Sequence, residues 1–396
     1  MTQAAAQSSA STTADVIVVG AGPAGSSAAY HMATLGLDVI LLEKQELGRD
    51  KVCGDGLTPS AVRELVSMGV DTSGWQRNRG LRVIGGGHLL HFPWPEQASF
   101  PSYGMARPRA LLDRDLAEHA AAAGARLLTG VTATGPVTSP TGRVTGVEAR
   151  PTNRVAYPGI EAPTTFSAPL VIDAGGVSAR LATALGRTKN ERRPMGVAVR
   201  AYFRSPRAKD AWMESRLELW DGTPGKSDLL PGYGWIWSVG EGLVNVGLGS
   251  VSSRAQATAI DYRAVFNRWM DNVPASWGFT KENQVGGLVS AALPMAFNRK
   301  PHYADGLMLL GDAGGMVSPF NGEGIAQALL SGRLAAQAAA QAAARSTTSG
   351  REQVLAQYPK ALSAEMGGYY TLGRVFVALI EHPEVMRLCT RYGLPR

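Results

Sequence analysis

Residues 16–44 read VIVVGAGPAGSSAAYHMATLGLDVILLEK. An apolar segment, Val16–Val19, leads into a glycine-rich turn and then into a small-residue segment that is helical in character to about Leu35. A second apolar segment follows at Val39–Leu42. This order predicts a strand, a helix and a parallel strand, the unit that opens a Rossmann-like sheet. The turn has the glycine spacing that lets backbone approach a pyrophosphate, and its residues are Gly20, Gly22, Pro23, Ala24 and Gly25.

An acidic residue completes this unit. Glu43 ends the second predicted strand, 23 residues after Gly20, and Lys44 follows it. A carboxylate at that place can accept hydrogen bonds from ribose hydroxyls. Because the strand, turn, helix and acid occur in this order, we interpret residues 16–44 as a dinucleotide-binding site rather than a plain glycine turn.

A second glycine motif decides which dinucleotide is expected. Residues 307–328 read LMLLGDAGGMVSPFNGEGIAQA, an apolar strand followed by glycines and a long alanine-rich helix from about Gly324. A carboxylate here can accept from sugar or ribityl hydroxyls, and the helix N-terminus attracts a phosphate. A nicotinamide dehydrogenase needs no such second site, so we predict FAD. The predicted contacts are Gly311, Asp312, Pro319, Gly322, Gly324 and Ile325.

The middle of the chain has a different character. Strand-type segments recur at residues 195–203, 215–221, 233–239 and 243–251, which predicts an antiparallel sheet inserted between the two glycine motifs. Tyr233, Trp235 and Trp237 alternate, so they share one face of a strand. They form either an aromatic wall for a hydrocarbon chain or an ordinary sheet core. Trp94 lies in a second aromatic loop that we place near the same pocket.

Composition narrows the classes of protein. The 396 residues carry a net charge of +7, but no dense basic run with interleaved aromatic residues, which argues against nucleic acid. The net positive charge still allows binding to an anionic membrane surface or to an acidic substrate. Cys53 and Cys389 lie too far apart for a disulfide framework and fit a cytoplasmic protein. The six histidines have no ligand spacing, so we expect no metal. Residues 1–13 read as a disordered tail, and no segment is long enough to span a membrane.

Together these motifs resemble the geranylgeranyl reductase family of FAD-dependent oxidoreductases, which has the p-hydroxybenzoate hydroxylase-like fold. KVCGDGLTPSAV supplies Cys53, Gly56 and Ala61 of its CxxGxxxxA pattern. LPGYGWIWSVG supplies Pro231, Tyr233 and Trp235 of its Pro-Tyr-Trp stretch. Arg109, four residues before Asp113, and the Gly-Asp pair at 311–312 also match.

The resemblance implies a composite α/β fold: a Rossmann-like FAD-binding domain, an inserted antiparallel β-sheet substrate domain and C-terminal helices. We place the FAD-binding domain at 14–80, 102–185 and 290–345, the substrate domain at 81–101 and 186–289, and the helical segment at 346–396. The resemblance also puts Cys53 and Gly54 beside the isoalloxazine, and Arg109 and Gly175 near FAD. Cys53, Asp55, Tyr233 and Trp235 are the candidate catalytic residues. Packing alone also accounts for Cys53, and a turn role for Asp55.

Two departures from the family pattern bear on substrate and electron donor. Trp237 stands where the family usually has phenylalanine, so it can reshape the pocket. Ala174 stands where the class usually has aspartate, and Asp173 comes one place earlier, which puts it on the other face of an extended segment. The electron donor is therefore open between NAD(P)H and a ferredoxin-type redox partner.

The expected activity is reduction of carbon–carbon double bonds in a polyprenyl chain. The substrate is a prenyl diphosphate, a prenylquinone or a terpenoid, and contact with a membrane surface is an accompanying expectation. The alternative enzyme is an FAD-dependent monooxygenase acting on a prenylated or aromatic substrate, since one fold supports both chemistries. A carrier of lipid or flavin is the non-enzymatic alternative.

Overall fold

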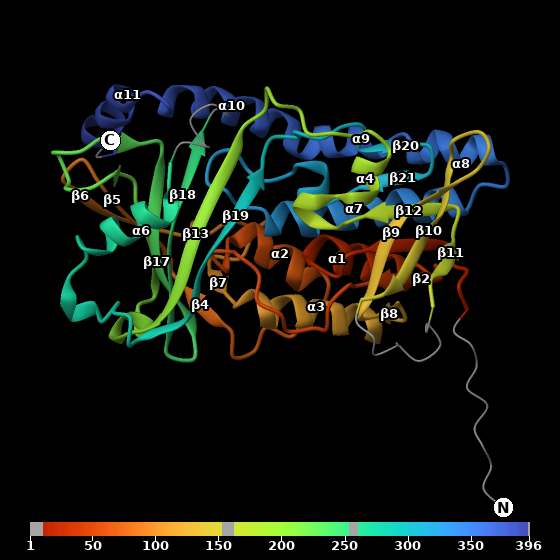
Figure 1. Ribbon diagram of the computed structural model, residues 1–396, viewed down its shortest axis with the longest axis horizontal. Coiled ribbons are helices and arrows are strands. Elements are labelled where there is room, and N and C mark those ends of the chain that lie inside the picture. The colour runs from red at the N-terminus through yellow and green to blue at the C-terminus, as the bar shows by residue number, and fades with distance from the viewer. Residues whose placement is uncertain (1–10, 153–161, 253–259, 395–396) are drawn as a thin grey trace, which may run out of the picture.

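The computed structural model describes residues 11–152, 162–252 and 260–394. A six-stranded sheet forms the frame of its first part, in the right half of Figure 1. In order across the sheet its strands are β20 (Tyr303–Ala304), β21 (Leu307–Leu309), β12 (Leu170–Asp173), β1 (Val16–Val19), β2 (Val39–Leu42) and β8 (Arg126–Leu128). All neighbours from β21 to β8 pair in parallel. The predicted Rossmann-like sheet is confirmed.

Both faces of this sheet are buried, which explains why its strands are apolar throughout rather than alternating. On one face Val16 and Val18 pack against three helices, α1 (Pro23–Thr34), α3 (Arg109–Ala122) and α7 (Ile325–Ala343). The α1 and α7 helices touch at Gly332, where a Cβ would come within 2.7 Å of the Ala24 carbonyl oxygen. The alanine-rich sequence of α7 is therefore a requirement of close helix packing.

The opposite face of the frame is covered by a smaller sheet. Its antiparallel strands are β9 (Val131–Thr138), β10 (Val144–Pro151) and β11 (Thr164–Ser167), with the helix α4 (Arg180–Ala184) beside them. Thr13 bridges to Ser167, and Arg126 donates hydrogen bonds to the carbonyls of Ser11 and Thr13. Residues 11–13 are thus ordered rather than part of a free tail. Residues 1–10 of the predicted tail lie outside the described residues.

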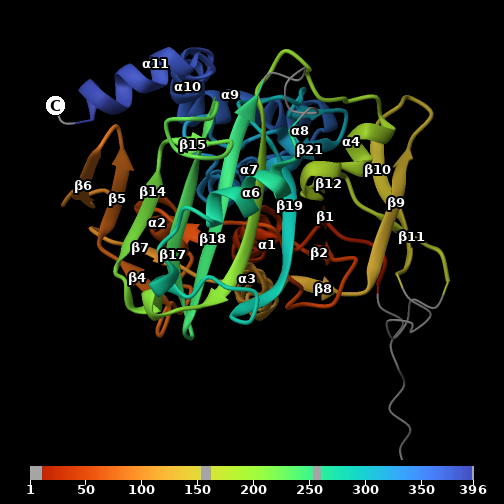
Figure 2. The ribbon, with the colours of Figure 1, turned by 60° about the vertical axis from the view of Figure 1, so that its left-hand side comes forward.

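A seven-stranded sheet makes up the second part and is seen more openly in Figure 2. Its order is β19 (Gln284–Pro294), β13 (Met195–Arg204), β18 (Leu243–Ser252), β17 (Gly232–Gly240), β14 (Trp212–Arg216), β5 (Gly80–Gly85) and β6 (His88–Pro93). The pairs are antiparallel apart from β14 with β5. The helix α6 (Tyr262–Met270) covers one face through Val265 and Phe266. The other face carries Trp235 and Trp237 and turns toward the first part of the molecule.

A small three-stranded sheet joins the two parts. It consists of β3 (Gly56–Leu57), β7 (Gly104–Ala106) and β4 (Gln76–Asn78), with the helix α2 (Pro59–Ser67) after β3. A two-stranded ribbon, β15 (Leu219–Trp220) with β16 (Leu229–Leu230), lies at the edge of the second part. Short 3₁₀ turns occupy Gly176–Ser178, Pro206–Lys209, Ala275–Trp277 and Gly311–Gly314, and π-helical turns occupy Ser363–Gly367 and Cys389–Gly393.

The chain closes with four helices along the top of Figure 1. The first two, α8 (Thr348–Leu355) and α9 (Tyr358–Leu362), pack on α7, and Leu355, Tyr358 and Leu362 enter the same buried core as α1. The last two, α10 (Gly368–Ile380) and α11 (Pro383–Leu388), continue past the frame, and Ile380 and Met386 pack on β16. Within the described ranges, none of the helices combines the length and apolar character that crossing a bilayer requires.

Candidate active site

Two helix N-termini meet at the carboxyl end of the six-stranded sheet, one following β1 and the other following β21, with β12 between these two strands. The α1 helix starts after Gly22 and α7 after Gly324, and neither has a side-chain cap. A Cβ on Gly311 would lie 3.0 Å from Cβ of Ala24, so the two glycine motifs are in contact. Uncapped N-termini offer unpaired N–H groups and a positive potential to phosphates. This arrangement fits the pyrophosphate of FAD, and the residues of the second motif would hold another part of the same cofactor.

The first glycine turn has no room for side chains. A Cβ on Gly25 would stand 1.9 Å from the carbonyl oxygen of Gly20, whose own φ is +104°. Glu43 holds the turn, because its carboxylate accepts from the N–H of Ala21 at 3.0 Å and of Gln45 at 3.1 Å. A carboxylate has about four acceptor positions. Glu43 can therefore still accept from a ribose hydroxyl as predicted, whereas Lys44 is exposed.

Asp312 has the free carboxylate of the site. Its Oδ1 lies 3.4 Å from the position of a Cβ on Gly324, beside the start of α7. Among the described residues its side chain has no hydrogen-bond or ion-pair partner. A half-buried carboxylate left without a protein partner fits the predicted role as acceptor for FAD hydroxyls. Pro319 of the same motif faces α10 instead, because a Cβ on Gly373 would lie 2.4 Å from its ring.

Arg109 forms the cationic side of the site. Its guanidinium, 5% exposed, makes two hydrogen bonds of 2.7 Å to the carboxylate of Asp113. It lies 3.9 Å from a Cβ position on Gly22 and also acts on Cys53. Burial raises the pKa of the Cys53 thiol, against the opposing charge of Arg109. A neutral thiol is a weak nucleophile, so the geometry favours a packing role for Cys53.

Asp55 is buried in the centre of the site, at 0% exposure and with a φ of 62°. Its Oδ1 accepts from the N–H of Arg109 at 3.1 Å. Its Oδ2 accepts from the hydroxyl of Tyr202 at 2.5 Å and from the amide of Asn245 at 2.8 Å. Burial raises the pKa of Asp55 to about 6, against the lowering effect of the Tyr202 and Asn245 hydrogen bonds. Asp55 is thus a carboxyl group that can carry a proton near neutral pH.

Sequence reasoning missed Tyr202 and Asn245. Asn245 lies in the strand LVNVGLGSV, where a lone amide between valines was an available signal. It donates to Asp55 and accepts from the indole Nε1 of Trp235 at 2.8 Å. Tyr202 carries the guanidinium of Arg200 above its ring at 4.1 Å, and Arg200 also pairs with Asp50. These strand residues fix the loop that carries Asp55.

Three aromatic residues line the other side of Asp55. The rings of Tyr233 and Trp235 are 6.1 Å apart, and those of Trp235 and Trp237 stack at 5.9 Å. Trp237 donates to the carbonyl of Gly54 at 2.6 Å, and a Cβ on Gly54 would lie 2.9 Å from its ring. Tyr233 donates to the carbonyl of Asn321 in the second glycine motif at 2.6 Å. These three aromatic residues, the aromatic wall, therefore contact both the loop of Asp55 and the second glycine motif.

Trp94 packs against the cluster that contains Trp235 and Trp237. Asp173 lies apart from this chemistry, because its two oxygens accept from the N–H groups of Gly175 and Ala182. Ala174 backs the first glycine turn, where its carbonyl oxygen would be 2.5 Å from a Cβ on Gly20. No group of three or more metal-ligating side chains occurs within the ranges that the structure describes.

Comparison with known proteins gives consistent results. The sequence profile of the FAD-binding domain family matches residues 13–361. A menaquinone reductase of Mycolicibacterium smegmatis is 36% identical over 381 residues, covering 95% of this chain and 87% of that protein. Digeranylgeranylglycerophospholipid reductase 1 of Methanothermobacter thermautotrophicus is 29% identical over 365 residues, covering 90% and 84%. A geranylgeranyl bacteriochlorophyll reductase-like structure from Thermoplasma acidophilum has the same fold, with a TM-score of 0.75, 24% identity, and coverage of 96% and 97%.

Proposed function

The chain belongs to the FAD-binding domain family and is an FAD-dependent oxidoreductase, and from that premise we propose that it saturates carbon–carbon double bonds in the polyprenyl chain of a prenylquinone. The observation that carries this proposal is Asp55, a fully buried carboxyl group with a raised pKa of about 6, close to an aromatic wall. The menaquinone reductases among its relatives favour a quinone head over a diphosphate or a glycerolipid.

Saturating an isolated alkene needs two electrons and two protons, with one new bond to hydrogen at each carbon. FAD, when bound and reduced, supplies the electron pair together with one of the hydrogens. The second carbon takes a proton, and Asp55 is the buried acid available to release it. Tyr202, whose hydroxyl donates to Asp55 at 2.5 Å, holds the carboxyl group in place.

The aromatic wall excludes water from the reacting bond. Trp235 and Trp237 are 5% and 8% exposed, and Met213 and Ala106 fill the space behind them. Apolar and aromatic contacts position a hydrocarbon chain that offers no polar group to bind. The wall contacts the loop of Asp55 through Trp237 and the second glycine motif through Tyr233, so an alkene against it would lie close to the proton source.

The test of the function is anaerobic turnover. Reduced, FAD-loaded protein is mixed with a prenylated quinone without oxygen, and the product is analysed by mass spectrometry. We expect a mass gain of two hydrogen atoms per saturated bond, with reoxidation of the flavin in step. Products that contain an added oxygen atom, formed only when oxygen is admitted, would establish the monooxygenase instead. Flavin that stays reduced in the presence of substrate would establish a carrier.

Substitution of Trp237 by phenylalanine is expected to shift the distribution of products. The smaller ring leaves room at the wall, and the lost hydrogen bond to Gly54 costs about 1 kcal/mol of unfolding free energy. Tyr233→Phe is the control, because it also loses one hydrogen bond to a backbone carbonyl but keeps its ring. Equal product ratios in both variants and the unchanged protein would show that the wall is only sheet core. Melting temperature, bound flavin and products are measured on all three.

We also propose that α10 rests on an anionic membrane that holds the substrate. Its exposed apolar side chains follow the spacing of one helix face: Leu372, Val375, Phe376 and Leu379. Residues 368–394 carry three arginines against two glutamates, and the exposed arginines at 387 and 391 lie on α11 and the turn that follows it. Apolar burial in the lipid interface combined with attraction of arginine to anionic headgroups is the pattern of an interfacial helix.

Leu372→Ser together with Phe376→Ser is expected to reduce binding to phosphatidylglycerol vesicles by about tenfold or more, because two large apolar side chains no longer enter the lipid. Leu35→Ser is the control, since Leu35 is 54% exposed at the end of α1. Binding is measured by co-sedimentation. Vesicle binding that is equal in the double variant and the control would exclude α10 as the contact. Turnover of a short, detergent-dispersed substrate is expected to stay unchanged.

A further inference from the structure

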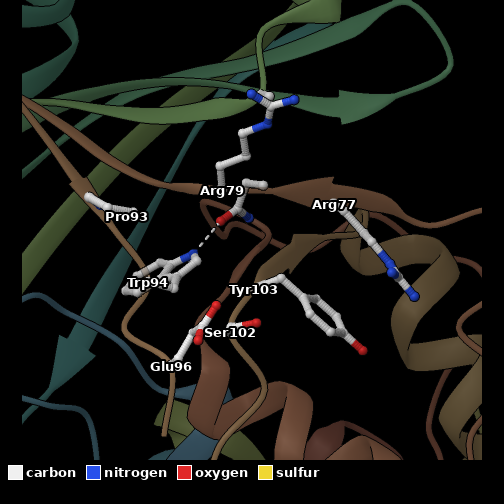
Figure 3. A pocket seen from close by; sticks show the side chains of 9 residues that line it. Arg77, Arg79, Pro93, Trp94, Glu96, Ser102 and Tyr103 are labelled. Carbon is white, nitrogen blue, oxygen red and sulfur yellow. Dashed lines mark hydrogen bonds between the residues drawn. The ribbon is translucent and has the colours of Figure 1, made fainter.

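A pocket of about 350 Å³ lies beside the β4 strand of the small three-stranded sheet (Figure 3). Its walls come from the link between β4 and β5, the end of β6, and the residues before β7. Figure 3 shows Trp94 and Arg77 on opposite sides, with Tyr103 between them. The lining residues that bear on a ligand are Arg77, Asn78, Arg79, Trp94, Glu96 and Tyr103.

Two arginines give this pocket a positive charge that the protein does not neutralise. In the described part of the chain, Arg77 and Arg79 form no ion pair. Arg77 instead lies over the ring of Tyr103 at 4.4 Å. Arg82 on the neighbouring sheet, by contrast, is neutralised, because it forms ion pairs with both Asp210 and Glu214. Glu96 on the rim offsets only one of the two free charges.

A buried amide adds an independent sign of a ligand. Asn78 is 6% exposed and lines the pocket. The indole of Trp94, which can only donate, gives its hydrogen to Oδ1 of Asn78 at 2.7 Å and so fixes the orientation of the amide. The Nδ2 group of Asn78 then has no partner in the described residues. Gly104 makes this possible, because a Cβ there would lie 2.6 Å from Oδ1 of Asn78.

We propose that this pocket binds a phosphate ester. Guanidinium groups and an amide N–H are the donors that recognise phosphate oxygens, and the faces of Tyr103 and Trp94 suit an attached ring or hydrocarbon. Burying an amide donor without a partner is costly. The Nδ2 group is covered in this structure, so a phosphate oxygen would satisfy it after a shift of the lining side chains. The proposal does not rest on the function above. Trp94 packs against the Trp235–Trp237 cluster, so a ligand here would lie next to the active site.

Two sources share this chemistry: a nucleotide that serves as electron donor, and the diphosphate head of a prenyl substrate. Calorimetric titration of the FAD-loaded full chain with inorganic diphosphate, NADPH, NADH and geranylgeranyl diphosphate separates them. NADPH binding about tenfold tighter than NADH would identify the nucleotide, through its additional phosphate. Binding of geranylgeranyl diphosphate that inorganic diphosphate displaces, with no NADPH binding, would identify the prenyl head. Either result supports the pocket as a phosphate site.

Two variants locate the binding. Arg77→Gln with Arg79→Gln is expected to weaken the affinity of the bound probe by at least about tenfold, because charge-assisted hydrogen bonds are lost. Asn78→Asp keeps an acceptor for Trp94 but places a negative charge in the pocket, and should weaken binding comparably. Arg150→Gln, an exposed arginine on β10, is the control and should bind as the unchanged protein. The proposal is overturned if no probe binds, or if the arginine variant and the control bind equally. Circular dichroism and flavin content confirm that each variant is folded.

Discussion

Asp55→Asn is expected to slow double-bond reduction by about 100- to 10,000-fold, the usual contribution of a general acid, while the protein keeps its FAD. Asparagine has nearly the same shape and tolerates the positive φ of 62° at this position. It can still accept the N–H of Arg109 but has no acidic proton to give. Single-turnover decay of reduced flavin with substrate measures the loss.

The pH profile tests the same residue independently. The acid form of Asp55 is the active one, and its raised pKa of about 6 places the loss of that form above pH 6. We therefore expect kcat/KM to fall about tenfold per pH unit above this value. This descending limb of the pH profile should be absent in Asp55→Asn. Tyr202→Phe removes a hydrogen bond that lowers this pKa, so it should move the limb to higher pH. A limb that is unchanged in Asp55→Asn would assign the proton to another group.

Asp312→Ala is expected to weaken FAD binding by about 10- to 100-fold, because hydrogen bonds to a charged carboxylate are lost. The stability of the protein without FAD should change little, since this carboxylate has no protein partner in the described residues. Titration of FAD into the cofactor-free protein measures the affinity, and thermal unfolding of the same sample measures the stability.

Asp173→Asn is the matched control, as a buried aspartate on the neighbouring strand β12. Its carboxylate bonds the backbone of Gly175 and Ala182. Substitution should therefore lower the unfolding free energy by about 1–3 kcal/mol and reduce FAD affinity much less than Asp312→Ala does. Equal losses of FAD affinity in both variants would mean that Asp312 acts by holding the fold, not by contacting the cofactor.

The sequence alone determined the framework of this protein. The strands Val16–Val19, Val39–Leu42 and Leu170–Asp173, the helix after Gly22 and the long helix after Gly324 were all predictable. Their signals are local: apolar runs buried on both faces, glycines that permit a turn, and alternation along several strands of the inserted sheet. The presence of a second glycine motif late in the chain also indicated FAD, because each motif precedes a helix whose N-terminus can bind a phosphate. The roles of the predicted site residues remain predictions.

Only the tertiary structure decided the chemistry around Asp55. Its partners Tyr202 and Asn245 lie 147 and 190 residues away in the sequence, on strands of the inserted sheet. Trp237 likewise donates its hydrogen bond to Gly54, which is 183 residues away in the sequence. The buried amide of Asn78 also depends on tertiary packing, because it fits only where Gly104 has no side chain. A proton affinity is set by burial and by the donors around a carboxyl group, and both arise from the packing of distant segments, which no local pattern records.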